Sequence, residues 1–379
     1  MLPAIHQLRR DLHQHPELSG QEQLTSQGIA SFLRQHHDTE ILTGLGGHGL
    51  AAVYTFSTKG PTIVIRCELD ALPIEETNSF DHRSVHPGVS HKCGHDGHMA
   101  IVAGLVLWLR EQPLRNGKVV LLFQPAEETG AGAEALLKDE RFRRLAPDYV
   151  FALHNLPGEE SGTIIVKDGV FTATVLSVAL LLQGKVAHAS EPENGINPAL
   201  AMAEITKSLA ALAQPHIHQQ DFALLTAVYS RLGEKAYGIS AGNGELHYTL
   251  RTWSEGRMQG LKEDLLKVSE TVCTQHGLRL TTGWFDYFPA VVNNEDCNSL
   301  VKQAATANDY PLKQRTTPFK FGEDFGWFSK EYKTAFFGLG AGCNMPALHH
   351  NDYDYPDEIT ERGIRMFGSI IKELLHPGG

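Results

Sequence analysis

The feature that most constrains the fold is a set of strand-like runs in the first half of the chain, several of which are apolar without alternation. They read LAAVY (50–54), TIVIRC (62–67), KVVLLFQ (118–124) and YVFALH (149–154). Continuous apolar strands are typical of a parallel sheet that helices cover on both faces. Helix-length segments stand around these runs, at 3–14, 21–36, 98–111 and 131–138. The alternation predicts an α/β domain with a largely parallel sheet.

From about residue 174 the order of the elements changes. The expected elements are strands at 175–183, 222–230, 245–253 and 278–284, with helices at 197–213 and 257–276. The order β-α-β-β-α-β is that of a ferredoxin-like, split βαβ unit. Helix–strand alternation then returns, with FFGLG (336–340) as a buried strand. We therefore expect a small domain of residues 174–285 inserted into a larger one, which residues 1–173 and 286–379 form together.

Length and composition agree with two globular domains. A chain of 379 residues, 42% hydrophobic and 20% charged, is too long for one ordinary core and has the composition of a folded protein. Its net charge of −11 argues against a nucleic-acid or anionic-membrane partner, because phosphate binding requires a basic surface. We find no secretory signal, no run long enough to span a bilayer and no disulfide framework among five scattered cysteines. These features predict a cytoplasmic protein.

Side chains that can bind metal follow several of the expected strands. They are Glu68 and Asp70 after the run at 62–67, Glu127 and Glu128 after 118–124, His154 at the end of 149–154, and His349 and His350 shortly after 336–340. In an open α/β sheet, ligands bind outside the carboxyl ends of the strands. Four strand ends therefore deliver carboxylates and imidazoles to one edge of the sheet, which predicts a metal site there.

Two short motifs sharpen this expectation. CGHDGH (93–98) places Cys93 and His95 at a helix start, and thiolate and imidazole are good ligands for zinc and similar ions. Alone, this motif also suits polar residues that merely begin a helix. The paired Glu127 and Glu128 allow one carboxylate to bind metal while its neighbour takes a proton from water. The alternative is a solvated acidic pair that the helix dipole favours.

The inserted unit offers two further candidates. GKVAHAS places His188 just after a strand, where a histidine is more often structural or solvated. Arg251 stands near the end of the strand at 245–253 and is a candidate clamp for a carboxylate, because a guanidinium can donate to both oxygens. An ordinary surface ion pair is the alternative for Arg251.

Taken together, the motifs resemble those of one family. In chain order they are RRDLHQHPELSGQE, RCELDALPIEE, HKCGHDGHMA, QPAEETGAGA, ALHN, GKVAHAS, GEDFGWF and ALHHNDYDYPDE. This series resembles the metal-dependent amidohydrolases typified by hippurate hydrolase, auxin-conjugate hydrolase and N-acetyl-diaminopimelate deacetylase, within the aminoacylase/carboxypeptidase superfamily. The resemblance covers essentially the whole chain. It implies a catalytic domain with an inserted lid and dimerisation domain, and hydrolysis of the amide bond of N-acyl amino acids or related small carboxylated amides.

The resemblance also implies a role for individual residues. The residues that match the ligands of two divalent ions (Zn, Mn or Co) are Cys93, His95, Glu128, His154 and His349. Glu127 matches the general base, and Asp70 matches the carboxylate beneath the site. His188 resembles the lid histidine that contacts the substrate carbonyl, in many relatives across a dimer interface, so a homodimer is expected. Arg251 matches a strand position suited to the substrate carboxylate.

Two positions depart from the family pattern. Relatives commonly have Asp where this chain has Glu68, and the longer acid would alter the geometry under the metals. Many relatives carry an Asn-Ile-Ile-Pro-like segment in the lid, whereas this chain reads AYGISAG with Gly238 at the place of the asparagine. The lost polar group bears on which acyl group or substrate is accepted.

Three alternatives stay open at this point. The first is a hydrolase that uses Cys93 as nucleophile with a nearby histidine as base, which leaves the other clusters unexplained. The second keeps the chemistry but acts on dipeptides or another small amide. The third is a non-catalytic metal-binding protein on the same scaffold, and the altered lid is its only support.

Overall fold

The computed structural model describes residues 2–375, and the chain divides into two compact units. Unit 1 consists of the residues up to Phe171, Val291–Thr316 and the residues from Glu323 onward, and unit 2 consists of Thr172–Ala290 and Thr317–Gly322. The predicted insertion covered residues 174–285. The segment Thr317–Gly322 belongs to unit 2 because Phe319 forms a parallel bridge with Thr172 and its carbonyl accepts from the Ala173 N–H at 3.0 Å. The roles expected for the two parts, catalysis and lid, stay predictions.

Unit 1 contains an eight-stranded sheet with a parallel centre. Its strands, in spatial order, are β1 (Glu40–Leu45), β2 (Gly49–Thr55), β4 (Lys118–Gln124), β3 (Thr62–Glu68), β5 (Tyr149–Pro157), β16 (Lys333–Gly342), β6 (Ile164–Val166) and β15 (Leu312–Gln314). The four central strands β4, β3, β5 and β16 are parallel, whereas β1, β2 and β6 pair with their inner neighbours in antiparallel fashion. β3 and β5 are buried along almost their whole length, as their apolar sequences predicted. The expected fold class is confirmed.

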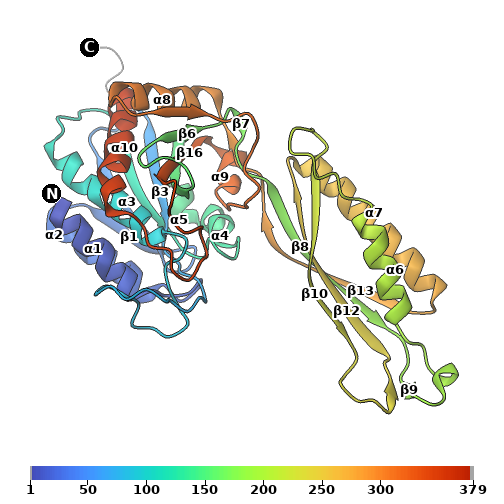
Figure 1. Cartoon of the computed structure of the whole chain (residues 1–379). Coiled ribbons are helices and arrows are strands. Elements are labelled where there is room, and N and C mark those ends of the chain that lie inside the picture. Colours follow the sequence, from blue (N-terminus) through green and yellow to red (C-terminus); the bar gives the residue numbers. More distant parts are fainter. Residues whose placement is uncertain (1, 376–379) are drawn as a thin grey trace. The chain divides into compact units, whose positions relative to one another are not determined.

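Helices cover both faces of this sheet (Figure 1). One face carries α1 (Leu2–Gln14), α2 (Gln23–His36), α3 (His95–Glu111), α8 (Glu295–Ala307) and α10 (Thr360–Leu375). The other carries α4 (Gly132–Lys138), α5 (Glu140–Arg143) and α9 (Gly326–Glu331). Among the described residues no helix combines the length and the apolar character needed to cross a membrane.

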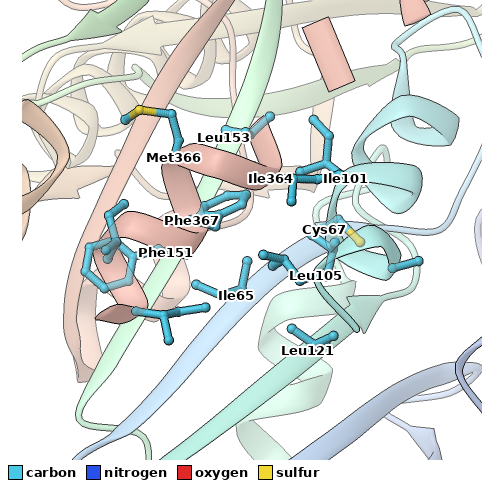
Figure 2. Close-up of a cluster of buried hydrophobic side chains, with 14 of the residues drawn as sticks. Ile65, Cys67, Ile101, Leu105, Leu121, Phe151, Leu153, Ile364, Met366 and Phe367 are labelled. Atoms are coloured by element: carbon cyan, nitrogen blue, oxygen red, sulfur yellow. The ribbon is translucent and has the colours of Figure 1, made fainter. Parts of the chain in front are cut away.

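The main core lies between the strands and the helices α3 and α10 (Figure 2). Ile65 and Leu121 of the sheet are fully buried against α3, whose Ile101 and Leu105 are also inaccessible, and Phe367 of α10 completes the cluster. Burying such a side chain stabilises the fold by about 1.5–3 kcal/mol. Because α3 is held along its length, its first turn, which is formed by the last four residues of the CGHDGH motif, has a fixed place.

Unit 2 has the ferredoxin-like arrangement expected from the order of its elements. Its antiparallel sheet has the order β10 (Ala223–Leu232), β12 (Asn243–Thr252), β8 (Thr174–Gln183), β13 (Arg279–Phe288). The helices α6 (Ala199–Ala210) and α7 (Glu255–Gln275) pack side by side on one face of it (Figure 1). A small ladder joins β9 (Ala187–His188) to β11 (Ile239–Ser240), with Ile239 opposite His188.

Candidate metal centre

The residues expected to bind metal lie together in unit 1. The Cys93 Sγ atom is 3.4 Å from Nε2 of His154, which lies within β5, three residues before the end of that strand. His95 Nε2, at the start of α3, is 3.8 Å from Glu128 Oε1, and His349 Nε2 is 3.7 Å from that same oxygen. The ligand atoms of Cys93, His95 and His154 lie within 4.8 Å of one another, as do those of Cys93, Glu128 and His349. The candidate ligands therefore lie close together, as the sequence predicted, although His154 was expected at a strand end and β5 continues to Pro157.

Hydrogen bonds turn the two buried histidines toward this point. The Asp70 carbonyl oxygen accepts from His95 Nδ1 at 2.8 Å, and the Asn155 carbonyl oxygen accepts from His154 Nδ1 at 2.8 Å. A carbonyl can only accept, so in each neutral ring Nδ1 carries the proton. Nε2 is therefore the nitrogen with a lone pair, and backbone support of this kind is common for histidines that bind metal.

Unsatisfied buried atoms indicate that a cation fits here. His95 Nε2, Glu128 Oε1 and Asp70 Oδ1 are buried and have no hydrogen-bond partner within residues 2–375. Leaving such a group unpaired costs about 1–3 kcal/mol, and more when it is charged. A thiol, three imidazoles and carboxylates suit divalent ions such as Zn, Mn or Co. The donor set and its unpaired buried atoms therefore fit metal ions. Burial and the nearby Glu128 carboxylate raise the pKa of the Cys93 thiol well above its usual value when no metal ion is bound.

Glu127 lies at the edge of the cluster. Its Oε2 is 4.0 Å from His95 Nε2, and its Oε1 accepts from the Asp324 N–H at 3.3 Å. Burial and the neighbouring carboxylates of Glu323 and Glu128 raise the pKa of Glu127 well above its usual value. A carboxylate with a raised pKa is suited to accept and return a proton near neutral pH.

Asp70 supports two elements of the centre from below. Its Oδ2 accepts from the Glu128 N–H at 2.9 Å and from Ser19 Oγ at 2.6 Å, while its carbonyl orients His95. Asp70 is completely buried. It thus fixes both a backbone position beside Glu127 and the ring of a candidate ligand.

Sequence reasoning missed a buried ion cluster behind the centre. Arg66 of β3 has no exposed side-chain surface and donates to Glu68, to Gln124 Oε1 at 2.8 Å, to Glu323 at 3.0 Å and to Asp324 at 2.8 Å. A buried charge is tolerated only when it is paired, so the arginine in TIVIRC and the acids in GEDFGWF were signals that could have been joined.

Glu68 is held by protein groups rather than left open to the centre. Its Oε1 accepts from Arg66, and its Oε2 lies 2.7 Å from His98 Nδ1. The other nitrogen of His98, Nε2, accepts from the Asn155 N–H at 3.1 Å. Glu68, His98 and His95 could hold an ion by proximity, yet Arg66 already balances the Glu68 charge. The longer acid at this position therefore serves the ion cluster.

Lys92 connects the loop of Cys93 to the loop of His349. Its carbonyl oxygen accepts from the His349 N–H at 2.8 Å, and its Nζ donates to the Tyr353 carbonyl at 2.7 Å. Nζ also pairs with Glu76 at 2.5 Å, and Lys92 is fully buried. The backbone of His349 has a left-handed φ of 66°, which side-chain-bearing residues rarely adopt.

His13 lies in the same buried network, between two carboxylates. Its Nδ1 is 2.8 Å from Asp96 and its Nε2 is 3.0 Å from Glu76. Burial opposes a charge on this ring, but the Asp96 charge and the hydrogen bonds outweigh burial and raise the pKa of His13 to about 9. The ring, together with Arg9, which pairs with Asp96 and Asp354, already neutralises this acidic group.

The remaining candidates, His188 and Arg251, lie in unit 2. His188 Nδ1 accepts from the Ser190 N–H at 3.1 Å, so the neutral ring carries its proton on Nε2, and the side chain is exposed. Arg251 Nη1 donates to the Lys320 carbonyl at 2.6 Å, and within residues 2–375 it has no ion pair. The Gly238 carbonyl accepts from the Ala189 N–H at 3.0 Å, and a Cβ at Gly238 would meet no atom within 4 Å.

Comparison with known proteins points in one direction. The profile of Peptidase family M20/M25/M40 matches residues 64–373. The N-acetylcysteine deacetylase of Bacillus subtilis (strain 168) is 30% identical over 370 residues, which cover 97% of this chain and 96% of that protein. An N-acetyl-L-cysteine deacetylase of the same organism is 32% identical over 375 residues, 97% of this chain and 87% of that one. The crystal structure of the Bacillus subtilis YXEP protein, described as a dinuclear metal-binding peptidase of the M20 family, is 29% identical with a TM-score of 0.82 and covers 97% of both chains.

Proposed function

The chain belongs to peptidase family M20/M25/M40 and is a hydrolase, and on this premise we propose that it splits the amide bond of N-acyl amino acids or related small carboxylated amides. The observation that carries the proposal is Glu127 beside a cluster of metal-binding donors, in which the buried atoms His95 Nε2 and Glu128 Oε1 have no hydrogen-bond partner within residues 2–375. The two similar deacetylases, which by name act on N-acetylcysteine, support this substrate class.

We assign the metal-binding role to the five clustered donors. They are Cys93, His95, Glu128, His154 and His349. The similar dinuclear peptidase supports two divalent ions, which would be Zn, Mn or Co. When bound, such ions lower the pKa of water toward neutrality and stabilise negative charge on a carbonyl oxygen. Asp70 keeps His95 and the Glu128 backbone in place for this purpose.

Glu127 acts as the general base and then as the general acid. It takes one proton from the attacking water while the water oxygen bonds to the amide carbonyl carbon. The carbon–nitrogen bond then breaks, and Glu127 returns the proton to the leaving nitrogen. The products are a carboxylic acid and a free amine. The raised pKa of Glu127 supports both proton transfers.

His188 and Arg251 recognise the substrate in this proposal. With Nδ1 occupied by the Ser190 N–H, His188 presents Nε2–H, a donor suited to the oxygen on which charge develops. Arg251, which forms no ion pair among residues 2–375, keeps most of its donors for the carboxylate of the leaving amino acid. The open space at Gly238 lies beside the His188 ladder and supports tolerance for a bulky group there.

We further propose a homodimer formed through unit 2. β10 is at the edge of its sheet and exposes Val228, Tyr229 and Leu232, with 58%, 47% and 43% of their surface accessible. An exposed apolar edge strand is a template for pairing with a second chain. Light scattering in solution tests this, because the chain mass is 41.7 kDa and a dimer has twice that mass.

We place the protein in the cytoplasm. All five cysteines are free, which suits a reducing compartment. In an oxidising compartment the Cys93 thiol could be oxidised, and it would then no longer bind metal.

The experiment that tests the function combines metal removal with two glutamate variants. The protein is stripped with chelator, reloaded with Mn²⁺, Zn²⁺ or Co²⁺, and assayed for amine release from hippurate, N-acetyl and indole-acetyl amino acids and dipeptides. Hydrolysis should vanish on stripping and return with metal. Glu127→Gln should lose at least about 100-fold in kcat with its metal content intact, whereas Glu128→Gln should lose metal. Full activity after the metal is removed would contradict the metal-dependent mechanism and favour Cys93 as a nucleophile. Full activity in Glu127→Gln would contradict the role of Glu127 as the base.

A further inference from the structure

The residue before the proposed base has an unusual backbone. Ala126 has a φ of 51°, in the left-handed region that residues with a Cβ rarely occupy. It directly precedes Glu127 and Glu128. Strain of this kind persists only where surrounding groups enforce it, and it is concentrated at functional sites.

A buried carboxylate from another part of the chain enforces this conformation. Glu22 Oε1 accepts from the Ala126 N–H at 2.8 Å and from the Gly20 N–H at 2.8 Å. The Ala126 carbonyl in turn accepts from the Gly132 N–H at 3.1 Å. Glu22 has no accessible surface, and its second oxygen, Oε2, has no hydrogen-bond partner among the described residues. Burying a carboxylate that uses only one of its oxygens is unfavourable, so these two hydrogen bonds need a reason other than stability.

The segment that contains Glu22 also reaches the other side of the base. Ser19 Oγ donates to Asp70 Oδ2, which accepts from the Glu128 N–H. The backbone on each side of Glu127 is therefore tied to a carboxylate, at Ala126 by Glu22 and at Glu128 by Asp70. Residues 19–22 support both ties, which gives the SGQE stretch a role that the metal ligands alone did not explain.

We propose that Glu22 is a positioning residue for the hydrolysis: by accepting from the Ala126 N–H it holds the left-handed turn that aims the Glu127 side chain. The inference rests on the proposed role of Glu127. Glu22 acts through the backbone and touches no reacting atom. What matters is therefore its ability to accept a hydrogen bond, more than its charge.

Four variants test this inference. Glu22→Met removes the acceptor and keeps the length, and it should lower kcat about tenfold or more with KM and metal content unchanged. Glu22→Gln keeps an acceptor and should stay within about threefold of the wild-type kcat. Adding Ala126→Gly to Glu22→Met should recover most of the loss, because glycine adopts positive φ without strain. Glu17→Met is the matched control: its carboxylate accepts from the Thr25 N–H at 2.7 Å in α2 and not from Ala126, so kcat should be unchanged.

A second readout does not depend on activity. Amide hydrogen exchange, followed by mass spectrometry on peptides covering 125–132, should quicken about tenfold in Glu22→Met and stay unchanged in Glu22→Gln and Glu17→Met. Unchanged exchange in Glu22→Met would overturn the inference. Faster exchange in Glu22→Met with an unaltered kcat would also overturn it, and so would an equal loss of kcat in Glu22→Met and Glu22→Gln. Failure of the proposed function has a different signature, since wild-type protein would then be inactive on every substrate, or Glu127→Gln would be fully active, while the exchange result still reports on Glu22.

Discussion

Gly97 offers a sharp test of how tightly the centre is packed. It lies in the first turn of α3, and a Cβ added there would lie 2.2 Å from Cδ2 and 2.3 Å from Cε2 of Tyr355, where ordinary contacts begin at 3.4 Å. Tyr355 is only 1% accessible, so its ring cannot turn into solvent. Overpacking costs about 1–3 kcal/mol, and an overlap with a buried ring is at the upper end, about 3 kcal/mol, of which the better helix propensity of alanine offsets about 0.5–1. For Gly97→Ala we expect a net loss of about 2 kcal/mol of unfolding free energy.

Thermal unfolding of metal-free protein, followed by circular dichroism, measures this effect. A loss of 2 kcal/mol should lower the midpoint by about 4–8 °C. The matched control is Gly28→Ala in α2, where a Cβ meets no atom within 4 Å and should raise stability by about 0.5–1 kcal/mol. The Tyr355 ring packs edge-on against His98, whose Nε2 accepts from the Asn155 N–H, and the Asn155 carbonyl orients His154. Gly97→Ala should therefore also weaken metal binding in competition with a chelator. A Gly97→Ala midpoint at or above that of the wild type would refute the packing argument.

Three further predictions concern other groups. Lys92→Met removes the ammonium that donates to the Tyr353 carbonyl and to Glu76, so that only the His13 ring and the Ser84 N–H still contact this buried carboxylate, and it should cost about 3 kcal/mol in urea unfolding. Burial lowers the pKa of His13, but the Asp96 carboxylate raises it more, to about 9, which is above the value in the unfolded chain. The stabilisation by the charged ring is therefore complete below about pH 6.5 and is lost as the pH rises through about 9. The unfolding midpoint of the wild type should fall over this pH range, and that of His13→Gln should lack this fall. Arg251→Gln should raise KM about tenfold or more for N-acyl amino acids but not for their amides, and equal KM changes for both would exclude the carboxylate clamp.

The fold was largely predictable because strands that are buried on both faces have continuous apolar sequences. The run at 118–124 coincides with β4, and 62–67 forms all but the last residue of β3, since both strands are buried on two faces. β1 was missed because its sequence EILTGL mixes apolar and polar residues and half of them are exposed; among the described strands it pairs only with β2. The helix expected at 197–213 ends at Ala210. Periodicity alone could not assign Thr317–Gly322 to unit 2, because that depends on pairing with the distant start of β8.

The candidate site was predictable where it follows from strand ends. The carboxyl ends of parallel strands lie at the same edge of a sheet. Asp70 and Glu128 follow β3 and β4, and His154 lies near the end of β5, so the order of the strands alone predicts that they lie close together. Family membership confirms the resemblance that the motifs indicated. The Arg66 cluster escaped because its partners are far apart in the chain, with Asp324 separated from Arg66 by 258 positions. No local pattern links such residues, and only the folded chain shows which acids neutralise which base.

Backbone strain is the property that the sequence hides most completely. Non-glycine residues with positive φ are Ala126 and His349 at the centre, and three others elsewhere among the described residues: Ala146, Asp286 and Asp309. Asp and His are enriched in this region, but alanine gives no warning of it. At both Ala126 and His349 a fully buried residue accepts from the N–H, the Glu22 carboxylate in one case and the Lys92 carbonyl in the other. Two strained positions, each locked from outside and each beside or at a proposed functional group, indicate a centre whose geometry is set by its supports before any ligand binds.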